Sequence, residues 1–197
     1  MSGIRAQKAK LRAQILRARG ELTADEREAA AMALMERVRD LPGTTDEGAV
    51  AAYVSMGSEP GTGPLVEAMR NAGTRVLLPV LLPDNDLDWA EYRGPDALVR
   101  TARGLFEPTG PRLGPDAVAH ARLILLPGLA VDPRGVRLGR GGGSYDRALD
   151  RVLRAATHPA LVVLLYAHEV VASVPDEPHD HLVDAALTPR GVHRFRG

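Results

Sequence analysis

The sequence of 197 residues contains no cysteine, only two lysines and no long apolar run. Without cysteine the chain can form no disulfide and offers neither a thiolate metal ligand nor a cysteine nucleophile. No apolar run approaches the roughly 20 residues that a membrane-spanning helix needs. The 25 basic and 25 acidic residues leave a formal net charge of zero. Because nucleic-acid-binding proteins usually carry a basic excess, we expect no nucleic acid and no membrane as partners.

The N-terminal segment also lacks the apolar core of a secretory signal, so we expect a cytoplasmic protein. Residues 4–19 are basic and free of acidic side chains, which is a feature of mitochondrial presequences too. Against a presequence, Gly20 favours a helix end, and Thr23-Ala-Asp-Glu26 has the pattern of a capping box. We therefore predict a hairpin of two helices, 4–19 and 23–41, joined to the rest of the chain.

Beyond Pro42-Gly43, short apolar runs alternate with helical patterns. Buried strands are expected at 50–54, 75–78, 123–126 and 161–166, and a half-exposed strand at 88–93. Helices are expected at 62–71 and 144–156. This alternation predicts an α/β fold with a doubly wound, mainly parallel sheet sandwiched between helices. The stretches rich in proline and glycine are interpreted as loops, so we predict one domain over 1–197.

The most informative stretch is Arg137-Leu-Gly-Arg-Gly-Gly-Gly-Ser-Tyr-Asp-Arg147. It holds four glycines within five positions, flanked by three arginines, directly before a predicted helix. Glycine lets backbone N–H groups turn toward a ligand, and a helix start adds free donors and a partial positive charge. Both features suit a phosphate group. The alternative is a flexible loop before a helix, but plain linkers seldom carry three arginines among their glycines.

Three further segments follow predicted strands and contain glycine or polar residues. Ligands of open α/β sheets collect at the carboxyl ends of the strands. We expect these segments to lie at that edge of the sheet: Ser55-Met-Gly-Ser-Glu59, Pro127-Gly-Leu-Ala-Val-Asp132 and Ala167-His-Glu169.

Several segments, in order along nearly the whole chain, resemble the 5-formyltetrahydrofolate cyclo-ligase (methenyltetrahydrofolate synthetase) family. They are Lys8-Ala-Lys-Leu-Arg12, the Glu59 segment, Gly104-Leu-Phe-Glu-Pro108, Pro127–Asp132, Arg137–Arg147 and Val174-Pro-Asp-Glu-Pro-His-Asp180 with Val183-Asp184. The Pro-Gly-Leu-Ala element, followed at short range by Arg-Leu-Gly-x-Gly-x-Gly-x-Tyr-Asp, is specific as a pair. The resemblance implies a doubly wound α/β sandwich.

The resemblance also implies an activity and its partners. The family converts 5-formyltetrahydrofolate to 5,10-methenyltetrahydrofolate with ATP and Mg²⁺, releasing ADP and phosphate. The formyl oxygen is phosphorylated first, folate N10 then attacks the activated carbon, and phosphate leaves. Phosphoryl transfer depends mainly on positioning and electrostatics, so the absence of a cysteine nucleophile is no handicap. We expect 5-formyltetrahydrofolate and ATP as partners and a monomeric protein.

By this resemblance, several residues receive roles. Lys8 and Arg12 would contact ATP phosphates, and they lie at i and i+4 on one helix face, although a solvated basic face is the alternative. The remaining ATP contacts would come from Arg137, Leu138, Gly139, Arg140, Gly141, Gly142, Gly143, Ser144 and Tyr145. The folate contacts would come from Val54, Glu59, Arg140, Gly141, Gly142, Gly143 and Ser144. Arg140 and Tyr145 are the expected catalytic residues, although Tyr145 also fits a core position and Val54 fits ordinary core packing.

Gly142 and Ser144 depart from the pattern of the family, in which many members have a lysine and an aromatic residue there. The first change removes a positive charge near the phosphates, and the second removes a ring, although serine can cap a helix. A relative that binds nucleotide or folate without turnover is therefore one alternative. Another is a phosphosugar isomerase or deaminase, which would use His168 or Glu169 as its general base.

Two metal sites are conceivable. An acid at Asp146, in the first turn of the predicted helix, can simply complement the helix dipole. The resemblance makes it a Mg²⁺ ligand, with Asp184 as the second, and two carboxylates beside phosphate oxygens suffice for this ion. His179 and His181 could bind zinc, but hydrolytic zinc motifs have other spacings. We expect both histidines on the surface and Asp180 as a support of the site.

Overall fold

The computed structural model describes residues 3–41, 48–178 and 180–195 and is built on a seven-stranded sheet. The strand order is β11-β10-β9-β6-β1-β2-β3, in which the five central strands are parallel and the two outer strands antiparallel to their neighbours. The strands are β1 (Ala49–Ala51), β2 (Arg75–Leu81), β3 (Leu87–Glu91), β6 (Ala121–Pro127), β9 (Ala160–Leu164), β10 (Ala185–Thr188) and β11 (Gly191–Arg194). This topology confirms the predicted doubly wound, mainly parallel sheet.

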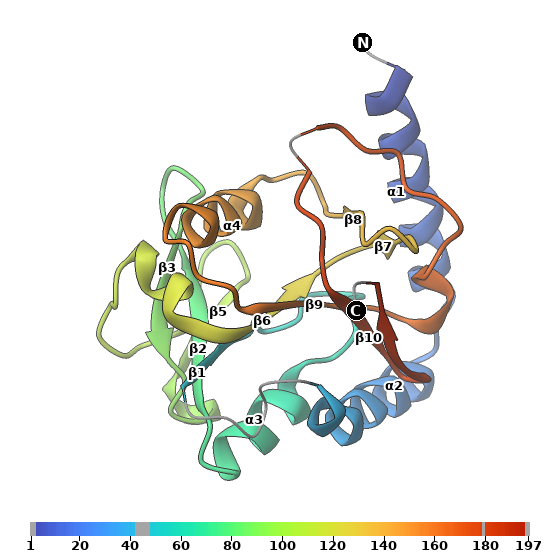
Figure 1. Ribbon diagram of the computed structural model, residues 1–197. Coiled ribbons are helices and arrows are strands. Elements are labelled where there is room, and N and C mark those ends of the chain that lie inside the picture. The colour runs from blue at the N-terminus through green and yellow to red at the C-terminus, as the bar shows by residue number, and fades with distance from the viewer. Residues whose placement is uncertain (1–2, 42–47, 179, 196–197) are drawn as a thin grey trace.

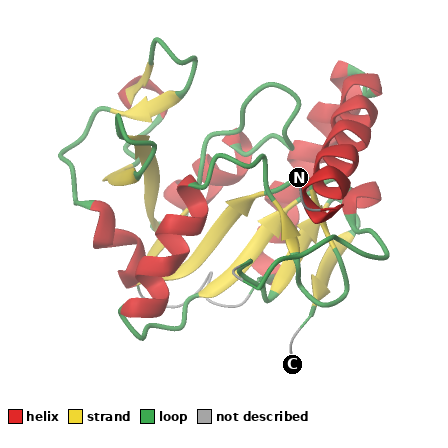
Figure 2. Ribbon diagram, turned by 90° about the horizontal axis from the view of Figure 1, so that it is seen from above, coloured by secondary structure: helices red, strands yellow, loops and turns green. Residues whose placement is uncertain are grey.

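Helices cover both faces of this sheet, which confirms the predicted sandwich (Figures 1 and 2). The helices are α1 (Gly3–Glu21), α2 (Ala24–Arg37), α3 (Gly63–Asn71) and α4 (Ser144–Arg154), with short 3-10 turns η1 (Val38–Asp40), η2 (Pro95–Ala97), η3 (Pro115–His120) and η4 (Ala167–Glu169). In the view of Figure 1, α4 lies above the sheet and α2 and α3 lie below it. Two small two-stranded sheets lie outside the main one, β4 (Leu98–Arg100) with β5 (Phe106–Pro108) and β7 (Ala130–Val131) with β8 (Arg137–Leu138).

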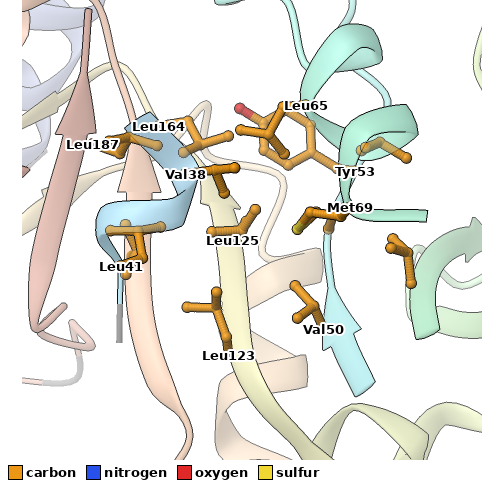
Figure 3. Close-up of a cluster of buried hydrophobic side chains, with 14 of the residues drawn as sticks. Val38, Leu41, Val50, Tyr53, Leu65, Met69, Leu123, Leu125, Leu164 and Leu187 are labelled. Carbon is orange, nitrogen blue, oxygen red and sulfur yellow. The ribbon is translucent and has the colours of Figure 1, made fainter. Parts of the chain in front are cut away.

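The central strands are buried on both sides, which accounts for their continuous apolar sequences. On one face, Val50 and Leu125 meet Leu65 and Met69 of α3 (Figure 3). On the other face, the side chains that alternate with these pack against α4, chiefly against Leu149 and its neighbours. The two halves of the core fix α3 and α4 on opposite faces, so that the loop before each helix opens at the same edge of the sheet.

The edge strand β3 departs from the sequence-based expectation. A half-exposed strand was expected at 88–93, but Trp89 is only 1% exposed and Ala90 is fully buried. The chain returns along this edge, where Leu113 N–H donates to the carbonyl of Trp89 at 2.8 Å. The η3 turn also packs against β3, and Val118 belongs to the same apolar cluster as Trp89. The alternation of residues within the strand could not indicate that its outer face is buried. The segment that covers this face, around Leu113 and η3, lies more than 20 positions further along the chain.

The predicted N-terminal helix pair is present, and its capping box is confirmed. Glu26 N–H donates to Thr23 Oγ1 at 3.2 Å, and Thr23 N–H donates to the Glu26 carboxylate at 2.8 Å. Helix α1 runs through Gly20 to Glu21, where a stop was expected. The two helices cover different neighbours, since α2 packs on α3 and β10, whereas Ile15 of α1 packs around the β7–β8 ribbon. Helix α1 is therefore placed at the segment that precedes the glycine-rich loop.

A buried threonine fixes the turn between β1 and α3. Thr62 Oγ1 donates to the carbonyl of Tyr53 at 2.6 Å and accepts the N–H of Ser55 at 2.9 Å. The N–H of Thr62 in turn donates to Ser55 Oγ at 3.1 Å. These bonds close the loop that carries Glu59, so the position of this loop follows from one side chain.

We predict that Thr62→Val lowers the free energy of unfolding by about 2 kcal/mol, because a buried N–H and a buried carbonyl lose their partner. Thr62→Ser keeps the hydroxyl and loses only a methyl group, so its loss should be about 0.8 kcal/mol. Urea denaturation of the three proteins measures both values. Equal losses in the two variants would show that the hydrogen bonds contribute nothing.

Candidate active site

A cavity of about 250 Å³ opens at the carboxyl ends of β1, β2 and β6, where the sequence predicts a ligand site. Its lining comes from the 53–59 turn, the end of β2, the β4–β5 hairpin, the end of β6 and the glycine-rich loop. The lining residues are Tyr53, Val54, Met56, Glu59, Pro79, Leu81, Leu87, Leu105, Phe106, Glu107, Pro127, Gly128, Arg137, Gly139, Arg140, Gly141, Gly142, Gly143, Ser144, Tyr145 and Asp146. The fold thus brings Val54 and Glu59 together with the residues of the loop, about 80 positions later in the chain.

Glu59 forms the polar wall of this pocket. Its Oε2 accepts the N–H of Met56 at 2.8 Å, and its Oε1 lies 3.3 Å from Arg140 Nε. The Glu59 side chain is 11% exposed, whereas Arg140 is about half exposed. Tyr166 reaches the same segment, since its hydroxyl donates to the carbonyl of Glu59 at 3.4 Å. The carboxylate is therefore fixed in place but keeps acceptor capacity for a ligand with N–H groups.

Two tyrosines lie at the pocket next to this carboxylate. Burial, and after it the nearby negative charge of Glu59, raises the pKa of Tyr53 and the pKa of Tyr145. Both hydroxyls are thus neutral and able to donate a hydrogen bond. The Tyr53 hydroxyl has no hydrogen-bond partner among the residues that the structure describes. Tyr145 packs against both halves of the core and also lines the pocket, so its position is compatible with the two roles that the sequence left open.

The glycine-rich loop crosses the pocket before α4. Gly141 and Gly143 have φ values of 96° and 74°, which side chains rarely adopt, so glycine is needed at both positions. Gly143 is the N-cap of α4, and no side chain caps this end. The first N–H groups of the helix are consequently free of side-chain partners at the pocket wall. Since Gly143 occupies the cap position, Ser144 does not cap the helix.

Arg12 of α1 meets the opposite side of this loop. Its Nε donates to the carbonyl of Gly139 at 2.9 Å. A Cβ atom placed on Gly141 would lie 3.4 Å from Arg12 Nη2, so the guanidinium lies directly against the backbone there. The structure thus brings Arg12 to the predicted phosphate-binding loop.

Arg137 lies beneath the loop and is nearly enclosed. Its Nη1 donates to the carbonyl of Pro127 at 3.0 Å, and its Nη2 donates to Asp146 Oδ1 at 2.8 Å. The Arg137 side chain is 6% exposed, whereas that of Asp146 is 56% exposed. Burial lowers the pKa of Arg137, and the nearby Asp146 carboxylate opposes this effect. The ion pair therefore joins a buried cation to an acid that faces the pocket.

Lys8 does not reach the pocket. Its Nζ lies 2.7 Å from Asp180 Oδ2 and 3.1 Å from Glu177 Oε2. Burial lowers the pKa of Lys8, but the hydrogen bonds and charges of Asp180 and Glu177 outweigh this effect and raise it. Asp180 also accepts the N–H of Glu177 at 2.7 Å, so it supports the segment that Lys8 binds.

Asp184 lies at the opposite edge of the sheet from Asp146, so the expected pair of metal ligands does not form. Asp184 Oδ2 accepts the N–H of Leu161 at 2.8 Å, at the amino end of β9. Asp146 lies in the first turn of α4, at the carboxyl edge of the sheet. Helix α4 runs from this edge toward the amino edge, where Asp184 lies. Because Asp184 directly precedes β10, which is parallel to β9, its place at the amino edge follows from the topology.

The structure does not support the two alternative sites that the sequence raised, a general base at His168 or Glu169 and a zinc site at His179 and His181. Glu169 is fully buried, and Arg19 donates to both of its oxygens at 2.6 and 2.9 Å. His168 stacks on Tyr166 at the surface, so neither residue faces the pocket as a general base. His181 pairs with Asp150 at 3.0 Å, and His179 lies outside the described residues. Across 3–41, 48–178 and 180–195, no group of three potential metal ligands among His, Cys, Asp and Glu is found.

Sequence reasoning missed the buried partner of Glu169. Arg19 is fully buried, and its Nη2 also donates to the carbonyl of Gly128 at 2.7 Å. The only local signal for the burial of Arg19 was its place at i+4 from the apolar Ile15, on the same helix face. Nothing local could identify its partner, because Glu169 lies 150 positions further along the chain. The pair anchors the end of α1 on the segment that lines the pocket.

Comparisons with known proteins agree with this geometry. The model of the 5-formyltetrahydrofolate cyclo-ligase family matches residues 4–189. The chain belongs to this family. A 5-formyltetrahydrofolate cyclo-ligase of Mycolicibacterium smegmatis is 42% identical over 75% of this chain and 77% of its own length. That of Escherichia coli is 31% identical over 88% of this chain and 96% of its own length.

Solved structures of relatives agree with the fold. The 5,10-methenyltetrahydrofolate synthetase of Aquifex aeolicus, solved by NMR, superposes with a TM-score of 0.81 and 28% identity. The match covers 96% of this chain and 93% of the other. Both the family and the fold expected from the resemblance are confirmed. None of the helices in the described part of the chain is long and apolar enough to cross a membrane.

The turn between β7 and β8 depends on one buried carboxylate of the family motif. Asp132 accepts the N–H groups of Arg134 and Val174 at 2.9 and 3.0 Å, and it also binds the Arg134 guanidinium. Burial alone would raise the pKa of Asp132, but these hydrogen bonds outweigh it and lower the pKa below the ordinary value of 3.8. Asp132 therefore adds stability above pH 3.8, which is lost as the pH falls through its lowered pKa.

We predict that Asp132→Asn lowers the free energy of unfolding at pH 7 by about 2 kcal/mol, since a charged acceptor is lost. Below pH 3.8 the stability of the variant should fall less steeply than that of the wild type. Urea unfolding at a series of pH values from 7 to 2.5 measures both effects. Parallel curves for the two proteins would exclude Asp132 as a source of the acid sensitivity.

Proposed function

We propose that this protein catalyses the ATP-dependent cyclisation of 5-formyltetrahydrofolate to 5,10-methenyltetrahydrofolate. The observation that carries the proposal is the pocket of a member of this family, in which a glycine-rich helix start faces a fixed carboxylate. The helix start with its free N–H groups suits phosphate, and the carboxylate of Glu59 suits the amino and ring N–H groups of a pterin. The relatives named above are 5-formyltetrahydrofolate cyclo-ligases, which supports the same assignment.

The triphosphate would bind along residues 139–143. Arg12 contacts this loop at Gly139, Arg140 belongs to it, and the start of α4 adds its partial positive charge. Arginine suits this role because its planar fork can bind two phosphate oxygens at once. Lys8 is less suited in the observed arrangement, since it already binds two carboxylates. Its proposed contact with ATP requires that one of them be released.

The reaction then needs few chemical groups from the protein. The formyl oxygen attacks the γ-phosphorus, so that an O–P bond forms and the bond to ADP breaks. The N10 nitrogen next attacks the formyl carbon, loses its proton and closes the ring, and phosphate leaves with the former formyl oxygen. Arg140 would stabilise the negative charge of the transferred group, and the neutral Tyr145 hydroxyl would donate a hydrogen bond to the same oxygens.

Asp146 is the residue that fits a Mg²⁺ ion. One of its oxygens binds Arg137, and its side chain is open to the pocket. Mg²⁺ in nucleotide sites usually takes one or two carboxylates and completes its shell with phosphate oxygens and water. A single aspartate is thus sufficient if ATP supplies the phosphate oxygens. The ion would neutralise phosphate charge, and Asp184 is not part of this proposal.

We predict that Asp146→Asn lowers turnover by about 100-fold or more at saturating Mg²⁺, because charge neutralisation at the phosphates is lost. Asparagine keeps a hydrogen-bond acceptor for the buried Arg137 but loses the opposing charge, so the melting temperature should fall, and circular dichroism checks that the variant still folds. The matched control is Asp150→Asn, one helical turn further along α4 and outside the pocket. Steady-state kinetics compares the variants. Wild-type turnover of Asp146→Asn would remove this residue from the site.

The activity itself is measured by following the formation of methenyltetrahydrofolate in the presence and absence of ATP. We expect product only with ATP and one ADP released for each product. If calorimetry shows binding of nucleotide and folate but no product forms, the non-catalytic alternative raised by Gly142 and Ser144 holds. Product formation without nucleotide would contradict the proposal altogether. The monomeric state and the cytoplasmic location stay predictions.

A further inference from the structure

The chain contains few aromatic residues but places three of its seven at the pocket, namely Tyr53, Phe106 and Tyr145. The two tyrosines lie deep and carry hydroxyl groups. Phe106 is different, because it is 44% exposed and has no polar atom in its side chain. Among the large apolar side chains that are exposed in the described residues, Phe106 alone lines the pocket. Its ring is thus partly open to solvent where it lines the pocket, so a ligand can contact it directly.

The β4–β5 hairpin holds this ring at the mouth. Glu107 Oε1 accepts the N–H of Leu81 at 3.0 Å and so attaches the hairpin to the end of β2. At the tip, the N–H of Thr101 donates to the carbonyl of Leu105 at 2.8 Å, and Pro108 is buried at the base. The ring therefore projects from an anchored strand and does not depend on a free loop.

The pocket has a polar and an apolar end. Glu59 lies toward β9, as its backbone contact with Tyr166 indicates. At the other end, Leu81 of β2 and Leu87 of β3 line the wall beside Phe106. A ligand with a polar ring system at one end and an aromatic ring at the other matches this division.

The size of the cavity limits what it can enclose. Its 250 Å³ is below the roughly 300 Å³ at which pockets begin to bury most of a drug-sized ligand. A folate has two ring systems, the pterin and the aminobenzoyl group, joined by a short bridge. The pterin carries the N–H donors that suit Glu59, so it belongs inside, and the aminobenzoyl ring is left at the mouth.

We propose that Phe106 packs against the aminobenzoyl ring of the bound folate and thereby makes the site selective for folates over free pterins. This inference rests on the proposed function, because it takes 5-formyltetrahydrofolate as the ligand. Aromatic pairs of this kind strengthen binding about two- to tenfold beyond the effect of the area that they bury. The ring needs no hydrogen-bond partner, which suits a phenylalanine in preference to a tyrosine at this place.

The test compares two ligands by calorimetric titration, 5-formyltetrahydrofolate and 5-formyl-6-methyltetrahydropterin, which lacks the aminobenzoylglutamate. Phe106→Ala should weaken the affinity for the folate about tenfold and the affinity for the pterin less than about twofold. Phe106→Tyr keeps the ring and should restore the affinity for the folate. The matched control is Val99→Ala, because Val99 is an equally exposed apolar residue of the same hairpin that lies outside the pocket. Thermal unfolding checks that all variants fold.

Two results would overturn the inference. An equal loss for both ligands would mean that Phe106 covers the pterin, and unchanged affinity for the folate would mean that the ring makes no contact. These results are separate from a failure of the proposed function, because binding is measured without turnover. A wild-type protein that binds the folate but forms no product contradicts the cyclisation and still tests Phe106. A wild-type protein that binds neither compound contradicts both proposals.

Discussion

The candidate site depends on the guanidinium of Arg137, which joins the end of the central strand β6 to the start of α4. Taking this cation out of water costs several kcal/mol, which the Pro127 carbonyl and the Asp146 carboxylate offset in part. The compensation is incomplete, because Arg137 Nε has no hydrogen-bond partner among the described residues. A buried positive charge thus lies beside a loop that lines the pocket and leads into a helix start without a side-chain cap. The Arg137 cation is in place before any anion binds. An incoming phosphate therefore meets a positive charge without a rearrangement of the protein.

Helix α1 ties three other segments to this arrangement through charged side chains on its buried face. Lys8, Arg12 and Arg19 bind, in this order, the 177–180 segment, the glycine-rich loop and the Gly128–Glu169 pair. The spacing of four and seven residues places all three on one side of the helix. Each long side chain ends at a polar partner, while Ile15 of the same helix packs in an apolar cluster. The basic helix face is therefore largely a set of structural contacts, of which those of Arg12 and Arg19 hold backbone carbonyls of pocket-lining residues, Gly139 and Gly128.

The sequence was sufficient for the architecture and for the centre of the site. Its apolar runs and capping box predicted four of the five central strands and the first helices, and the glycines with their arginines located the loop. The sequence was insufficient where a residue is buried or paired by a partner that lies far away along the chain. Nothing local indicates that Glu169 meets Arg19, or that η3 covers Trp89. The separation of Asp184 from Asp146 has a more specific cause, since the strand that follows Asp184, β10, was not predicted. A residue before a parallel strand lies at the amino edge, away from the site.

The division of the pocket suits the order of steps in the proposed reaction. A phosphorylated formyl group is open to attack by water, which would release formate instead of closing the ring. Pro79, Leu81 and Leu87 give this wall apolar side chains, and Glu107 beside them has one carboxylate oxygen bound to the N–H of Leu81. Closed sites prevent such side reactions by excluding water. In the proposed reaction, the activated carbon would lie between the cationic loop and this largely apolar wall, and N10 of the same molecule would have to reach it before water does.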